Sequence, residues 1–138
     1  MAANTNPIYS IAGDVQWGTS AITGSNTAKD GTGSVLTVFT ADATNGGRVE
    51  KIVARAAGTN TASVLRVFIN NGGATSTPSN NILFTEISLP ATTLTEVAAQ
   101  TEYSATLGFA LPPAYRITCC IGTTVAAGYY VSVVGGKY

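Results

Sequence analysis

The chain has 138 residues, the size of one domain, and its seven Lys and Arg residues balance seven Asp and Glu residues. Only 10% of the residues are charged, so we expect no basic surface that could bind nucleic acid or an anionic membrane. The chain contains no histidine, which excludes His-dependent catalysis, and we expect neither an enzyme nor a cofactor.

The chain begins with a polar segment. Residues 1–7 predict a flexible N-terminal arm, followed by a single β-sandwich domain over residues 8–138. No basic stretch leads into a long apolar run, so we expect no signal peptide and synthesis in the cytoplasm. The low charge gives little repulsion between copies, which favours a chain that functions in an assembly.

Turn signals rich in Gly, Asn and Asp separate short runs of β-branched and aromatic residues, at intervals of roughly 8 to 15 residues. This pattern predicts an all-β fold, an antiparallel β-sandwich. Residues 94–100 predict an irregular segment or a short helical turn. We predict eight or nine short strands, near residues 8–12, 15–22, 34–40, 49–57, 64–70, 82–89, 102–107, 115–121 and 129–134.

The strand at residues 49–57 does not alternate cleanly. Val49 and Val53 fall on the same face as Lys51, although an apolar side chain and a charged one prefer opposite environments. A β-bulge near Glu50 would move one part of the strand onto the other face. We therefore predict a bulge at this point.

Two further strands carry specific expectations. Residues 63–70 are apolar on both faces apart from Arg66, which predicts a central position in a sheet. Residues 115–121 alternate, which predicts one buried face. Cys119 and Cys120 are adjacent and point to opposite faces of this strand, so we expect two free thiols that act as small buried hydrophobes in a reducing compartment.

The acidic residues offer little chemistry. Asp30 and Asp42 stand beside turn glycines, where a side-chain oxygen accepts hydrogen bonds from nearby backbone N–H groups. No spacing brings two carboxylates together as a glycosidase requires. Residues 42–46 provide oxygen ligands for calcium but lack the alternating acidic pattern. We interpret both aspartates as turn residues, with no catalytic and no metal site.

The aromatic residues suit core packing, a protein interface or a sugar-stacking platform, because each ring joins an apolar face to a polar edge. Alternation in residues 129–134 directs Tyr129 inward and Tyr130 outward. Trp17 belongs to the same group of aromatic candidates. The candidate interface residues are Tyr130, Tyr138, Pro7 and Asn6.

Several motifs occur together in the first half of the chain. NTAKDGTG at residues 26–33 leads into VLTVFTA at 35–41, NGGRVEKI at 45–52 and AGTNTASVLRVFI at 57–69. Over roughly residues 4 to 75 this pattern is similar to that of small virion proteins of tailed phages and prophages. It resembles auxiliary capsid proteins, also called decoration or cement proteins. The long polar loop at residues 70–81 departs from their pattern.

The resemblance implies a fold, a role and partners. It implies a β-sandwich of jelly-roll type that forms a homotrimer on the outer surface of the virion head. The protein would be made in the host cytoplasm, bind the major capsid protein and stabilise the shell without enzymatic activity. We expect no nucleic-acid partner and no membrane partner.

Two other functions fit the same sequence. One is a tail or fibre-tip module that binds a glycan on the host surface, which Trp17 and the tyrosines favour. The other is a structural subunit of the tail or of the head–tail connector.

Overall fold

A computed structural model describes residues 10–138, so Asn6, Pro7 and the rest of the predicted arm lie outside the described residues. Its strands confirm the all-β prediction, and every strand pairing is antiparallel. A short 3-10 helix, η1 (Pro78–Asn80), interrupts them. The eight strands are β1 (Ala12–Trp17), β2 (Leu36–Thr40), β3 (Gly47–Ala56), β4 (Ser63–Asn70), β5 (Asn81–Leu89), β6 (Glu102–Leu111), β7 (Arg116–Ile121) and β8 (Tyr129–Lys137).

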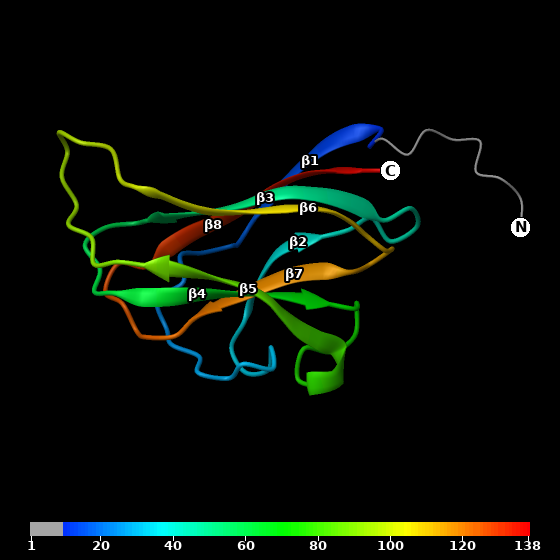
Figure 1. Ribbon diagram of the computed structural model, residues 1–138, viewed down its shortest axis with the longest axis horizontal. Coiled ribbons are helices and arrows are strands. Elements are labelled where there is room, and N and C mark those ends of the chain that lie inside the picture. Colours follow the sequence, from blue (N-terminus) through cyan, green and yellow to red (C-terminus); the bar gives the residue numbers. More distant parts are fainter. Residues whose placement is uncertain (1–9) are drawn as a thin grey trace, which may run out of the picture.

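The strands form two four-stranded sheets, in the orders β1-β8-β3-β6 and β2-β7-β4-β5. Figure 1 shows them as two layers, with the start of β1 and the end of β8 at the same end of the molecule. The pairings are nested: β1 pairs with β8, β2 with β7, β3 with β6 and β4 with β5. Ala12 accordingly lies opposite Lys137, so the first strand closes the sandwich against the last.

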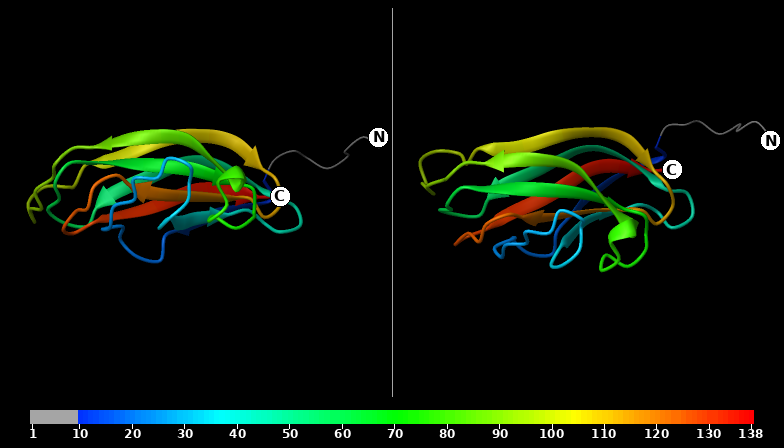
Figure 2. Two further views of the ribbon diagram at one scale, coloured as in Figure 1. Left: turned by 90° about the horizontal axis from the view of Figure 1, so that it is seen from below. Right: turned by 60° about the horizontal axis from the view of Figure 1, so that its bottom comes forward.

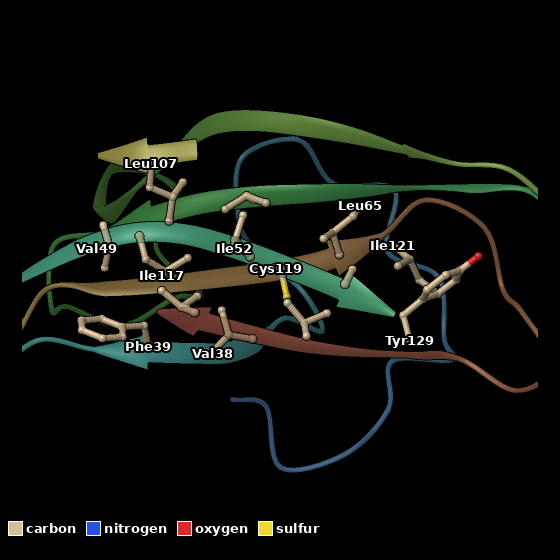
Figure 3. Packing of buried hydrophobic residues seen from close by; sticks show 14 of the residues in the cluster. Val38, Phe39, Val49, Ile52, Leu65, Leu107, Ile117, Cys119, Ile121 and Tyr129 are labelled. Carbon is tan, nitrogen blue, oxygen red and sulfur yellow. The ribbon is translucent and has the colours of Figure 1, made fainter. Parts of the chain in front are cut away.

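The hydrophobic core fills the space between the sheets. Figure 2 shows the layers from two further directions, and Figure 3 shows side chains from both sheets meeting between them. Burial of these side chains, at roughly 25 cal/mol for each Å² of apolar surface, is the main stabilising contribution. The largest are Tyr129, Phe39, Ile52, Leu65, Leu89, Ile117 and Ile121.

The first strand differs from its prediction. The sequence predicts two strands, near residues 8–12 and 15–22, but one strand runs from Ala12 to Trp17, and residues 8 and 9 lie outside the described residues. Gly13 signals a turn locally, but it lies in the ladder opposite Gly136. Long-range pairing therefore overrides the local turn preference.

Two details of the predicted strands are confirmed. A register shift between Val49 and Lys51 forms the predicted β-bulge, which leaves Val49 in the core while Lys51 faces outward. β4 lies between β7 and β5, as the apolar character of both its faces predicts. The segment from 94 to 100 is irregular and contains no helix.

The prediction of one buried face for residues 115–121 is wrong, because β7 is buried on both faces. Ile117 and Cys119 face the core, while Thr118 and Cys120 are buried on the opposite, outer face. Phe68 lies directly across from Thr118 on β4 and is also buried, although it is not part of the core between the sheets.

The segment between β1 and β2 covers this outer face, and Figure 1 shows it passing beneath the lower layer. The Asn26 N–H donates to the Ile121 carbonyl over 2.8 Å. The Asn26 carbonyl accepts from Arg66 Nη1 at 3.3 Å and from Cys120 Sγ at 3.7 Å. Alternation in β7 therefore predicts the two faces correctly but not the cover over the second one.

The adjacent cysteines fulfil their prediction. Both are free and buried, with Cys119 in the core and Cys120 under the covering segment. Burial raises the pKa of both thiols, because a thiolate loses its hydration there. These groups are therefore poor nucleophiles, as expected of small buried hydrophobes.

The turn between β2 and β3 provides a test of the fold. Gly46 has a φ of +78°, and a Cβ there would collide with the Leu111 carbonyl. We expect Gly46→Ala to lower the free energy of unfolding by more than about 1 kcal/mol in chemical denaturation. Gly24→Ala is the matched control, because Gly24 has no positive φ and a Cβ there would meet no atom within 4 Å. Equal stability of the two variants would contradict the assigned turn.

Candidate functional site

The outer face of the β1-β8-β3-β6 sheet exposes large apolar side chains. The register pairs Val15 with Val134 and Trp17 with Ser132, so these residues share one face. Trp17 is 68% exposed, Tyr130 61%, Val15 54% and Val134 42%. Contiguous exposed apolar side chains of this kind mark interaction surfaces. We define the β1–β8 strip as Gly13, Val15, Trp17, Tyr130, Ser132, Val134 and Gly136.

β1 has the reverse of the usual polarity for a sandwich strand. Its apolar residues face outward, while Asp14 and Gln16 point toward the other sheet. Gln16 Nε2 donates to Asp14 Oδ2 and to the Thr40 carbonyl, both over 2.9 Å. The Thr40 N–H in turn donates to Gln16 Oε1 over 2.8 Å. These bonds fix the orientation of β1 and hold Val15 and Trp17 on the outside.

The start of β8 is fixed by a buried asparagine. Asn60 Oδ1 accepts hydrogen bonds from the N–H groups of Ala127 and Gly128, over 2.8 and 2.9 Å. Asn60 Nδ2 donates to the Gly128 carbonyl over 2.8 Å. Tyr129 is fully buried immediately afterwards, so alternation turns Tyr130 outward.

Trp17 and Tyr130 stand beside a shallow hollow of about 300 Å³. The hollow combines aromatic faces with a guanidinium, a hydroxyl and backbone groups. Such a lining can stack against an apolar ring face and hydrogen-bond its polar edge. The residues that line it are Trp17, Gly18, Val53, Arg55, Tyr130, Val131 and Ser132.

The other half of the same sheet face is charged. Lys51 Nζ lies 2.5 Å from Glu102 Oε1, and Arg55 Nη2 lies 3.0 Å from Glu102 Oε2. Arg48 pairs with Glu50 on the same face. Three cations therefore share two carboxylates. Because these charges pair with one another on the surface, each pair adds little stability, and the face keeps one cation more than it has carboxylates.

Tyr138 lies next to this face. Glu50 raises the pKa of Arg48 by a hydrogen bond and by its charge, and Tyr138 adds a smaller rise. Tyr138 directly follows β8 and is half-buried. The last residue of the chain is therefore placed beside the end of the β1–β8 strip.

The predicted interface residues fall into two groups. Tyr130 lies on the β1–β8 strip and Tyr138 lies beside it, while Asn6 and Pro7 lie outside the described residues. Sequence reasoning missed Val15 and Val134. Two signals could have found them: the apolar residues of β1 alternate with Asp14 and Gln16, and β8 is apolar on both faces.

The aspartate side chains occupy turns, as interpreted from the sequence. Asp30 Oδ1 accepts from the Thr32 N–H and hydroxyl, and Asp42 Oδ1 accepts from the Thr44 and Asn45 N–H groups. These hydrogen bonds lower the pKa of both carboxyls. Within residues 10–138, no group of three His, Cys, Asp or Glu side chains could hold a metal ion.

The Glu102 ion pair makes a testable pH prediction. Lys51 is the main cause of the lowered pKa of Glu102, and Arg55 contributes less. NMR titration of the Glu102 carboxyl carbon should show a clear rise in its pKa in Lys51→Met and a smaller rise in Arg55→Met. Because the folded pKa lies below the unfolded one, the stabilisation is present above the unfolded pKa and is lost as the pH falls through the folded pKa. An unchanged pKa in Lys51→Met would contradict this pairing.

Two further observations complete the description of the site. In the part of the chain that the structure describes, no helix is long and apolar enough to cross a membrane. Comparisons of the chain with protein-family models, curated proteins and solved structures found no match.

Proposed function

We propose that the protein is a structural virion protein, a decoration or cement protein that binds the outside of a tailed-phage head. The observation that carries this proposal is the β1–β8 strip, an exposed apolar sheet face on a sandwich with zero net charge. A cement protein needs a rigid body and an adhesive face rather than catalytic chemistry. The resemblance of residues 4 to 75 to auxiliary capsid proteins supports the same role.

The proposal includes a jelly-roll topology. The nested pairing supports it, because β1 with β8, β2 with β7, β3 with β6 and β4 with β5 describe one long antiparallel hairpin wrapped into two layers. A jelly roll also contains eight strands in two sheets, as this fold does.

The proposed partners are the major capsid protein and other copies of this chain, in a homotrimer on the outer surface of the virion. Tyr130 and Tyr138 are the proposed interface residues within the described part of the chain, with Asn6 and Pro7 in the arm. A trimer would attach at three points, so weak individual contacts would combine into a firm attachment. Because it would bind only the assembled shell, it would stabilise that shell.

The copy number of the protein in purified virions tests this role. Quantitative mass spectrometry should find hundreds of copies, close to one per major capsid subunit. The major capsid protein in the same sample serves as the internal reference. A few copies per virion would instead indicate a tail or connector subunit, and would contradict the decoration role.

A second candidate function is a tail or fibre-tip module that binds a host-surface glycan. The specific observation in its favour is the hollow beside Trp17 and Tyr130, where aromatic faces adjoin the Ser132 hydroxyl and the Arg55 guanidinium. Among the described tyrosines, Tyr130 alone lines this hollow, and its neighbour Tyr129 is buried in the core. The tyrosines therefore do not form the expected platform there.

Trp17 is the only tryptophan of the chain, so intrinsic fluorescence reports on this hollow directly. If a glycan binds there, titration with a sugar that the protein binds on a glycan array should quench or shift the Trp17 emission. Tyr130→Ala should abolish this change in emission. Tyr115→Phe provides a control away from the hollow. If the protein binds no sugar on the glycan array and the Trp17 emission stays unchanged, this function is excluded.

A further inference from the structure

The outward-facing residues of β8 have nearly the same order in both directions. From Val134, one direction leads to Ser132 and then Tyr130, and the other leads to Gly136 and then Tyr138. Small residues therefore flank the central valine, and a tyrosine follows each of them.

Gly136 has no side chain, but the surface at this position carries a serine, as it does at Ser132. A Cβ at Gly136 would lie 2.5 Å from the Ser10 side chain, so a serine fills the space above this glycine. Tyr138 follows Lys137 and continues the alternation of β8, and it lies near enough to Arg48 to add to the rise in the pKa of that guanidinium.

β1 has a complementary arrangement around Val15, which lies directly opposite Val134. Two residues further on is Trp17, the largest side chain of the face. Two residues back is Gly13, and a Cβ at Gly13 would meet no atom within 4 Å. A large projection and an open space therefore lie at equal distances from the valine, on opposite sides.

We infer that the β1–β8 strip is a two-fold contact between two copies of this chain. The copies stack face to face with antiparallel strands, and the Val15–Val134 row lies on the symmetry axis. Trp17 of each copy then covers Gly13 of the other, while Tyr130 meets Tyr138 and Ser132 meets the serine above Gly136. Such a contact is isologous, because each residue contacts its counterpart in a reciprocal way.

The chemistry of the face fits a second copy. The apolar half carries Trp and Tyr, which contribute most to binding when an interface buries them. The charged half carries three cations and two carboxylates. Lys51 lies in the same row as Val134, so each Lys51 approaches the axis already paired with Glu102 of its own copy. The normal twist of stacked sheets, about 30°, concentrates the contact near the central valine row.

This contact goes beyond the proposed decoration role but uses the strip that carries it, so a second copy and the capsid would not both cover the strip of one chain. In a homotrimer held by another surface, the same strip would join one trimer to the next. On its own, the strip makes a dimer in solution.

The first experiment measures the mass of the purified full chain by analytical ultracentrifugation at micromolar concentration. We expect twice the chain mass of 14.0 kDa, or an even number of chains if trimers also form. Val15→Asp places two like charges on the axis, one strand further from Lys51 than Val134, and should weaken self-association about 100-fold or more. The matched control is Val97→Asp, because Val97 is 94% exposed in the loop between β5 and β6 and lies off the strip. Circular dichroism should show both variants folded.

The second experiment tests the symmetry itself. Only a residue near a two-fold axis lies close to its own copy, so a short bismaleimide should cross-link Val134→Cys into dimers and leave Val97→Cys monomeric. The native thiols should not react with the bismaleimide, because Cys119 and Cys120 are buried.

Dimers in both experiments, lost in Val15→Asp alone, would support the inference. A monomer, a trimer without cross-linking at position 134, or a monomer that binds a glycan at Trp17 would each overturn it. Both experiments use purified protein, so their failure is separate from a failure of the copy-number test on virions.

Discussion

A β-sheet has two faces, and the core of a sandwich covers only one face of each sheet. The β2-β7-β4-β5 sheet meets this constraint with its own chain, since the segment around Asn26 covers Cys120. The β1-β8-β3-β6 sheet has apolar residues on its outer face too, but residues 10–138 leave that face open to solvent. Each exposed apolar Å² costs roughly 25 cal/mol relative to burial, so the functional question is what covers this face.

The same few side chains serve every function considered for this surface. Trp17 and Tyr130 are the largest exposed residues of the strip and also line its hollow. A bound sugar and a second copy would therefore compete for one place, and either would exclude the other. The ion pairs of β3 and β6 border this area, and Arg55, which pairs with Glu102, also lines the hollow.

Local sequence signals predicted much of the fold. Turn residues and β-branched runs gave the strand count within one, and the misplaced valines of β3 predicted its bulge. What failed depended on partners distant in sequence. Gly13 has the character of a turn residue until its pairing with Gly136 is known. Gln16 is a polar residue that points into the sandwich, and only its hydrogen bonds to Thr40, 24 residues away, explain that placement.

The site was predicted only in part, for a related reason. Tyr130 could be assigned outward because its neighbour Tyr129 belongs to the core. Val15 and Val134 are ordinary strand residues one at a time, and they become significant only because the register places them side by side.

The nested pairing also determines when this surface can exist. During synthesis, β1 leaves the ribosome before the other seven strands, but the strand with which it pairs, β8, leaves after all of them. Contacts between such distant segments form slowly, because the intervening chain must be ordered first. The adhesive face is consequently absent from a nascent chain until residue 137 has left the ribosome. Incomplete chains lack this surface, so the order of the strands prevents them from associating through it before folding is complete.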